Sequence, residues 1–183
     1  FIQRPFVDGS VKNEKGNVGD ALIYGQEFLV NFIISDLFFD SKTIRVNYFI
    51  NLSNIKSEYI RSEINGVEGN QVEFVPKYNC KTGFSFNFKN FKTNLQYTFM
   101  SDQFTDATNS IESDLSGVIG TIPKYNVLDL SVSYFINNLR FEFGVNNILD
   151  EYYFTNRATG YPGPGIIPSP NRNFFITVQY KFN

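Results

Sequence analysis

Two polar stretches of the chain hold the residues whose types could do chemistry. Residues 101–121 carry four carboxylates, and residues 149–171 carry tyrosines and an arginine. Histidine, the commonest general base and metal ligand, is absent. The single cysteine, Cys80, therefore has no histidine to activate it as a nucleophile and no second thiol for a disulfide. We predict that the protein is not an enzyme and carries no cofactor.

The acidic stretch offers oxygen ligands of the kind that calcium prefers. Its carboxylates are Asp102, Asp106, Glu112 and Asp114. Neither their spacing nor the position of the glycines matches a calcium-binding loop, which needs a glycine at its sharp turn. We interpret this stretch as a solvated acidic loop, and we predict no metal site.

The second stretch combines aromatic rings with a cationic side chain. Tyr152, Tyr153, Arg157 and Tyr161 lie within it, and Arg172 follows it. Because arginine suits bidentate binding of carboxylates, the first four residues are candidates for ligand binding. The alternative is that they pack the loop, with Arg172 as a structural residue at the start of the last strand.

The elements that must position these residues are β-strands. From Phe174 to Phe182 every second residue is apolar, and the residues between them include Thr177, Gln179 and Lys181. Side chains alternate across a strand, so this segment has one aromatic face and one polar face. A barrel strand between lipid and a wet lumen shows this alternation. A soluble sheet with one buried face shows it too.

The chain before the last strand is interpreted as three hairpins. They join residues 28–34 to 44–50, residues 84–88 to 91–99, and residues 128–136 to 139–146. In the second hairpin a two-residue turn would pair Phe88 with Phe91, and in the third a turn at 137–138 would pair Ile136 with Leu139. Opposed residues share a face, and most pairs then match in polarity.

The polar face of these strands carries a few charged residues. Arg45, Arg140 and Glu142 alternate with apolar neighbours and would face the lumen of a barrel. We expect them, together with Arg172, to form cross-strand pairs or to contact whatever fills the lumen. Contact with a substrate is the alternative.

Composition favours strands and excludes some partners. The chain has 21 Phe and 11 Tyr, residue types that strands prefer. A net charge of −2 gives no basic field for nucleic acid. No apolar run approaches the roughly 18 residues that a membrane helix needs.

Short turns alternate with long polar stretches along the chain. The long stretches lie at about 53–71, 101–121 and 149–171. Strands with short turns at one end and long loops at the other are typical of an outer-membrane barrel, with the turns periplasmic and the loops extracellular. We predict an all-β antiparallel transmembrane barrel portion. In it, residues 1–21 form an extracellular loop and residues 22–183 form seven strands with their connections.

Motifs near the end of the chain indicate a particular kind of barrel. Residues 144–153 contain Asn146-Asn147-Ile148-Leu149-Asp150-Glu151-Tyr152-Tyr153, and residues 123–131, 160–162 and 170–174 flank this segment. Together with Arg172 and the terminal aromatic strand, they resemble the C-terminal end of TonB-dependent outer-membrane receptors. Residues 19–27 resemble the start of an earlier strand of these barrels. The ferric-citrate-type receptors are the nearest subgroup.

The resemblance implies a receptor in the outer membrane of a Gram-negative bacterium. Such a receptor imports a scarce nutrient, typically a ferric chelate or siderophore, by extracellular binding and plug gating. Family members hold a plug domain inside a 22-stranded barrel, and seven strands cannot close at that diameter. We therefore expect the C-terminal third of a receptor. Its partners would be outer-membrane lipid, the remaining strands and plug, and the TonB energy-coupling complex.

One departure from the family pattern concerns the last residue. The family usually ends on the aromatic residue, which assembly machinery would read, whereas Asn183 follows Phe182 here. A passive porin or an adhesin barrel would share the strand pattern, and so would a soluble β-sandwich that binds an apolar ligand. The motif at Asn146-Asn147 argues against the porin and adhesin alternatives.

Overall fold

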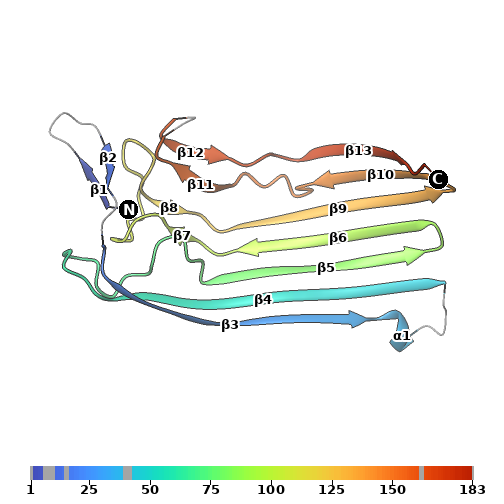
Figure 1. Cartoon of the computed structure of the whole chain (residues 1–183), viewed down its shortest axis with the longest axis horizontal. Coiled ribbons are helices and arrows are strands. Elements are labelled where there is room, and N and C mark those ends of the chain that lie inside the picture. Colours follow the sequence, from blue (N-terminus) through green and yellow to red (C-terminus); the bar gives the residue numbers. More distant parts are fainter. Residues whose placement is uncertain (1, 6–10, 15–16, 39–42, 161–162, 183) are drawn as a thin grey trace.

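The computed structural model describes residues 2–5, 11–14, 17–38, 43–160 and 163–182. Almost all of its regular structure is β-strand (Figure 1). The elements in chain order are β1 (Ile2–Pro5), β2 (Val11–Glu14), β3 (Asp20–Ile33), α1 (Ser35–Phe38), β4 (Ile44–Arg61), β5 (Tyr78–Phe88), β6 (Phe91–Met100), β7 (Gln103–Phe104), β8 (Thr121–Ile122), β9 (Tyr125–Ile136), β10 (Leu139–Asn146), β11 (Phe154–Ala158), β12 (Gly165–Pro168) and β13 (Asn173–Tyr180). Among the described residues, no helix is long and apolar enough to cross a membrane.

One seven-stranded antiparallel sheet dominates the fold. Its strand order is β13-β10-β9-β6-β5-β4-β3, so every strand pairs with its sequence neighbours among these seven. The pairs Phe88↔Phe91 and Ile136↔Leu139 confirm the predicted registers of the second and third hairpins. Lys89 and Asn137 hold positive φ angles of 49° and 52° in the two tight turns. The all-β antiparallel fold class is therefore confirmed.

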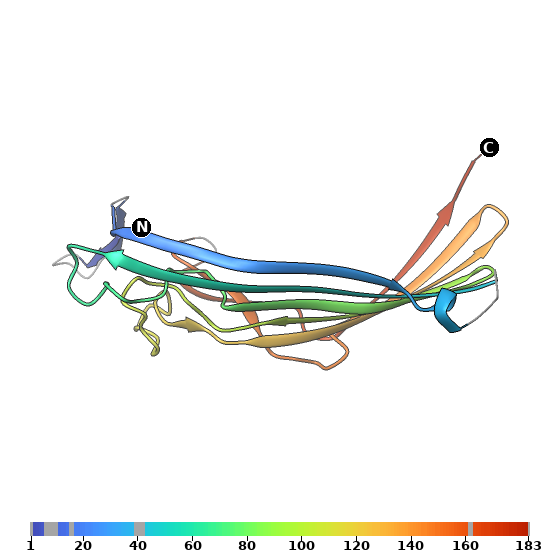
Figure 2. The ribbon, with the colours of Figure 1, turned by 90° about the horizontal axis from the view of Figure 1, so that it is seen from below.

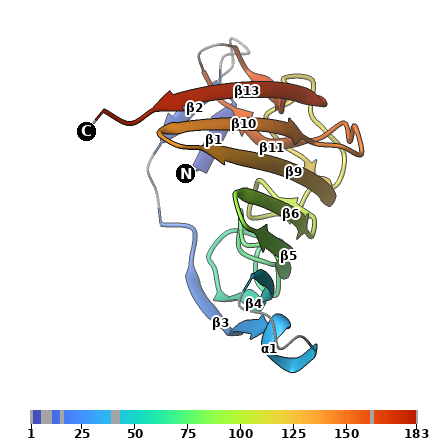
Figure 3. The same ribbon diagram turned by 90° about the vertical axis from the view of Figure 1, so that its right-hand side faces the viewer.

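The sheet curves, and its connections differ at its two ends. Viewed along the strands, the sheet forms an open arc from β13 to β3 (Figure 3). The hairpin turns lie together at one end of the strands, and the long connections lie at the other (Figure 1). Seen from below, the strands toward the C-terminus splay away from β3 and β4 at the turn end (Figure 2). A curved sheet with two exposed edges is the shape of part of a barrel wall.

One face of the sheet forms a continuous apolar band. On β4 the band runs from Ile44 to Leu52, and the register joins Tyr48 to Phe32 on β3 and to Phe84 on β5. Their rings lie close, with centroids 6.3 Å apart for Phe32 and Tyr48 and 4.8 Å apart for Tyr48 and Phe84. At about 3.4 Å per residue this stretch covers roughly 27 Å of strand. That length suits the apolar band of a tilted transmembrane barrel.

The opposite face is polar and more enclosed. Ser133 on this face is 2% exposed, whereas Phe143 on the apolar face is 42% exposed. Asn94 donates from its side-chain amide to Ser131 Oγ at 3.3 Å across this face. Polar side chains crowd together on the inside of a curved sheet, and the apolar face meets solvent or lipid on the outside.

Two of the aromatic rings on the polar face each lie over a glycine. Phe49 opposes Gly83, and Phe175 opposes Gly144. A Cβ added to Gly144 would lie 2.1 Å from Cε1 of the Phe175 ring, and one added to Gly83 would lie 2.8 Å from Cε1 of Phe49. The missing side chains make room for the rings, which explains why these two phenylalanines depart from the polar pattern.

We expect Gly144→Ala to destabilise the sheet. The new methyl group would overlap the Phe175 ring, and overpacking of this kind costs about 1–3 kcal/mol. The heat-dependent shift of the folded band on a gel would measure the loss in the intact receptor. Gly160→Ala is the control, because no atom lies within 4 Å of a Cβ built there. The clash is refuted if Gly144→Ala and Gly160→Ala unfold at the same temperature.

Several predicted boundaries were wrong. The supposed polar loop at 53–71 is strand as far as Arg61, and β5 begins at Tyr78 rather than Phe84. The backbone of this part of β4 is hydrogen-bonded to β3 on one side and, beyond Asn54, to residues 69–77 on the other, so its polar side chains do not end the strand. The remaining polar stretches also contain paired strands, β7 with β8 and β11 with β12.

The first 21 residues are not one unbroken loop. β1 and β2 pair as a short antiparallel hairpin, and β3 already begins at Asp20. The one-turn helix α1 also follows β3 where only a break was expected. The predicted turn at 40–41 lies outside the described residues. The extracellular position of residues 1–21 stays a prediction.

Candidate functional site

Three long connections at one end of the sheet are tied to one another. We call them loop A (62–77), loop B (101–124) and loop C (147–172). Asn109 of loop B donates its side-chain Nδ2 to the Gln71 carbonyl at 2.8 Å and accepts from the Gln71 N–H at 2.8 Å. The Phe74 N–H donates to the Phe104 carbonyl at 2.9 Å. Loops A and B therefore form a joined layer.

Arg157 on β11 ties loop C to loop B. Its Nε and Nη2 donate to the Thr121 carbonyl at 3.2 and 2.8 Å, and its Nη1 donates to the Gly117 carbonyl at 2.8 Å. The side chain is 8% exposed, and its Cζ lies 5.1 Å from the centroid of the Phe154 ring. Three hydrogen bonds to main-chain carbonyls make Arg157 a bridge between loops.

Local charges fit this arrangement. Desolvation by burial lowers the pKa of Arg157, and the nearby carboxylate of Asp114 opposes the change. Burial alone would raise the pKa of Asp114. Hydrogen bonds from the Ser116 hydroxyl and from the N–H groups of Ile119, Val118 and Ser116 outweigh that effect and lower it. The Asp114 carboxyl therefore stays ionised at neutral pH.

Two of the four carboxylates of loop B hold its backbone. Asp106 accepts from the Thr108 N–H at 3.0 Å and from the Ser110 N–H at 3.2 Å. Asp114 accepts from the Ile119 N–H at 3.1 Å. Within the part of the chain that the structure describes, no group of three or more acidic or cysteine side chains is placed to hold a metal ion.

Asn147, at the end of β10, joins the beginning and the end of loop C. It is 2% exposed and has a φ of +53°. Its Oδ1 accepts from the Glu151 N–H at 3.0 Å, and its Nδ2 donates to the carbonyls of Glu151 at 2.9 Å and Pro170 at 3.4 Å. Its own N–H donates to Asp129 Oδ1 at 2.9 Å. One buried amide thus connects β9, the turn after β10 and the approach to β13.

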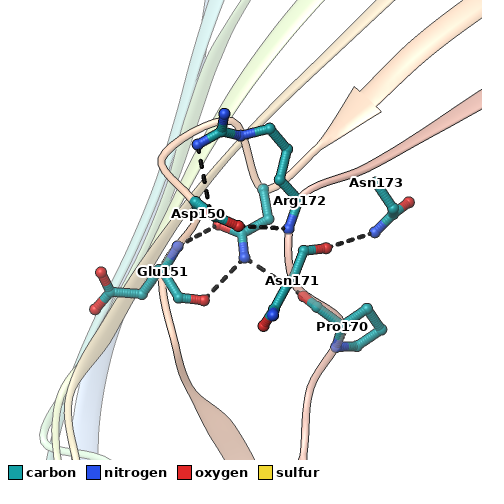
Figure 4. Close-up of polar contacts among 7 residues, drawn as sticks. Asp150, Glu151, Pro170, Asn171, Arg172 and Asn173 are labelled. Atoms are coloured by element: carbon teal, nitrogen blue, oxygen red, sulfur yellow. Dashed lines mark hydrogen bonds and ion pairs between the residues drawn. The ribbon is translucent and has the colours of Figure 1, made fainter.

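Asp150 adds a second connection (Figure 4). Its Oδ1 accepts from the Arg172 N–H at 2.9 Å, and its Oδ2 lies 3.7 Å from Arg172 Nη2. Asp150 also has a positive φ, 55°. We call Asn147, Asp150 and Arg172 the loop C clamp. Asparagine and aspartate both tolerate the left-handed conformation, which explains their place in the motif.

The predicted ligand-binding residues do not form one cluster. Tyr152 is 80% exposed. Tyr153 stacks on Tyr125, with ring centroids 4.7 Å apart and planes at 29°. Arg157 bridges two loops, and Tyr161 lies outside the described residues. The direct role of these four residues in binding stays a prediction.

The predicted inner-face residues differ in their surroundings. Arg140 Nη2 lies 2.7 Å from Glu142 Oε2 and donates to Ser133 Oγ at 3.4 Å. Arg140 Nε is buried and has no hydrogen-bond partner among the described residues. Arg45 makes no ion pair with a described residue. Arg172 precedes β13 and belongs to the clamp. Their contacts with a plug stay predictions.

The residues that sequence reasoning missed are Asn147, Asp150 and Asp129. The motif that contains the first two is recognisable in the sequence as a family signature, but its hydrogen bonds are not. The partner of the Asn147 N–H, Asp129, comes from a different strand 18 positions away. Only the fold brings them together.

These features define a class of protein. A curved antiparallel sheet with an apolar outer face, a polar inner face, short turns at one end and long loops at the other is part of the wall of a transmembrane β-barrel.

The sequence matches the family model described as TonB dependent receptor-like, beta-barrel, over residues 1–148. The chain therefore belongs to the TonB-dependent receptor β-barrel family. These barrels lie in the outer membrane of Gram-negative bacteria, which is also the location of this chain. The predicted family and location are confirmed.

Solved structures of transporters and receptors share the fold. The unliganded ferric citrate transporter FecA is 25% identical, with a TM-score of 0.78 over 88% of this chain. The ferric yersiniabactin uptake receptor FyuA from Yersinia pestis is 20% identical, with a TM-score of 0.71 over 91% of this chain. The siderophore receptor PiuA from Acinetobacter baumannii is 20% identical, with a TM-score of 0.68 over 91% of this chain.

The chain spans only part of these proteins. It covers 24% of FecA, 24% of FyuA and 22% of PiuA. The matched proteins are receptors and transporters rather than enzymes.

Proposed function

We propose that this chain is part of a TonB-dependent receptor that imports a ferric chelate or siderophore. The main support is the likeness to the ferric citrate transporter, at 25% identity and a TM-score of 0.78. The joined layer of loops A, B and C adds to it, because a preformed loop surface reduces the entropy lost on ligand binding.

In this proposal the chelate binds outside the cell and the chain performs no chemistry. Tyr152 and Tyr153 contribute aromatic surface at the entrance, and Arg157 holds the loops that carry them. The polar face lines the lumen, where a plug domain from the rest of the receptor gates passage. The TonB energy-coupling complex acts on that plug, and lipid covers the apolar face.

Uptake measurements test the proposal. The gene that encodes the chain would be deleted, and uptake of radioactive iron would be followed for citrate, hydroxamate and catecholate chelates. We expect uptake of one chelate class to fall to background, to return with the gene, and to fall again when TonB is inactivated.

Two other outcomes would contradict it. Uptake that depends on the gene but persists without TonB would indicate a passive porin. A gene product found in the soluble fraction, with iron uptake unchanged by deletion, would favour a soluble β-domain.

A further inference from the structure

A polar hollow lies on the inner face near the hairpin turns. Its lining residues are Thr43, Arg45, Asn47, Ser85, Asn87, Lys89 and Lys92. Its volume is about 660 Å³, within the range of pockets that accept a small molecule or a few side chains. Three of the seven lining residues are cations, and no carboxylate is among them.

The sheet register places two of the cations on either side of Asn87. Arg45 opposes Asn87 across β4 and β5, and Asn87 opposes Lys92 across β5 and β6. With strands about 4.8 Å apart, Arg45 and Lys92 stand roughly 10 Å from each other on one face. Both face the same space.

These two cations lack a counter-charge in the described part of the chain. Neither Arg45 nor Lys92 forms an ion pair there. The nearest carboxylate along the same row belongs to Glu142, beyond Ser133, and Arg140 already holds it at 2.7 Å. Lys89 places its Nζ 5.3 Å from the centroid of the Phe88 ring.

The two cations restrict what can cover the inner face of the barrel wall. If the proposed function is correct, the inner face is covered by a plug in the intact receptor. Covering a cation without a partner carries a large desolvation cost, whereas pairing it with a carboxylate offsets that cost. We infer that a carboxylate-bearing segment of the plug docks in the hollow between Arg45 and Lys92.

Chemical labelling in the intact receptor tests this inference. Asn87→Cys would report on the hollow in a Cys80→Ala background, with a membrane-impermeant thiol reagent applied to the periplasmic side of isolated outer membranes. We expect slow labelling in the parent receptor. Labelling should become about tenfold faster when Arg45→Glu and Lys92→Glu are combined, because like charges would then expel the plug segment.

Lys81→Glu is the matched control. Lys81 lies on the same face of β5 as Asn87 but does not line the hollow. It should leave the labelling rate unchanged. Heat-dependent gel migration would check that each variant still forms the barrel. In the doubly reversed receptor, a plug Asp→Lys or Glu→Lys change that restores slow labelling would identify the partner.

Three results would overturn the inference. The first is fast labelling of the cysteine in the parent receptor. The second is slow labelling that stays slow after the double charge reversal. The third is protection of the cysteine that requires added ferric chelate. The last result would assign the hollow to an anionic substrate. Iron uptake measured in the same strains reports separately on the proposed function, so the two can fail independently.

Discussion

Asn147→Ala is expected to lower the stability of the intact receptor barrel by about 3 kcal/mol. The substitution removes the amide that bonds to Glu151 and Pro170, and it leaves the Glu151 N–H and carbonyl without these partners in a partly buried place. Each unsatisfied buried group costs about 1–3 kcal/mol. Alanine is also less suited than asparagine to the φ of +53° at this position. Thermal unfolding of the detergent-extracted receptor would measure the loss.

Two further variants separate the causes. Asn147→Gly keeps the positive φ accessible and removes only the hydrogen bonds, so it should lose somewhat less than alanine. Asn146→Ala is the matched control, because that neighbouring amide is exposed and makes one side-chain bond, to Asn173 at 2.9 Å. It should change stability by less than about 1 kcal/mol. Equal unfolding temperatures for Asn146→Ala and Asn147→Ala would refute the structural role of Asn147.

Arg157→Ala is expected to loosen the loops without unfolding the barrel. The variant removes all three bonds from loop C to the carbonyls of Thr121 and Gly117. The affected segments lie outside the seven-stranded sheet, and such segments open locally at a lower free energy than the sheet itself. A protease added to intact cells should therefore cut loops B and C much faster, while the unfolding temperature stays nearly constant.

Arg157→Lys should behave almost like Arg157→Ala. A lysine carries the charge, but its single ammonium group lacks the planar fork that reaches two carbonyls at once. Lys124→Ala is the control, because Lys124 is an exposed cation of loop B. If Arg157→Ala weakens chelate binding and leaves the proteolysis rate unchanged, Arg157 acts on the ligand directly and the bridging role is wrong.

The hairpins could be predicted because their information is local. The alternation of residues 84–88 and 91–99 fixes which side chains share a face, and a two-residue turn fixes the register between the strands. The observed pairs Phe88↔Phe91 and Phe84↔Leu95 depend on nothing outside that segment. The same reasoning holds for the hairpin of β9 and β10.

The strand ends and the loops could not be predicted in this way. β4 continues through polar residues to Arg61 because its backbone is hydrogen-bonded on both sides. β3 lies on one side, and β5 followed by loop A lies on the other. Two short strand pairs form inside stretches that look like irregular loop. The polar composition of these stretches resembles that of a solvated loop. Whether two of their segments pair as strands depends on which segments the sheet brings together.

The sequence by itself determined the antiparallel sheet, its two faces and its membership of the receptor family, because alternation and turn chemistry act between near neighbours. Only the tertiary structure decided that Arg157 bonds to Thr121 and Asn147 to Asp129, which lie 36 and 18 positions away. It also decided that Arg45 and Lys92 share one hollow. These contacts join different strands and loops, and a linear pattern carries no information about the distance between such segments once the chain has folded.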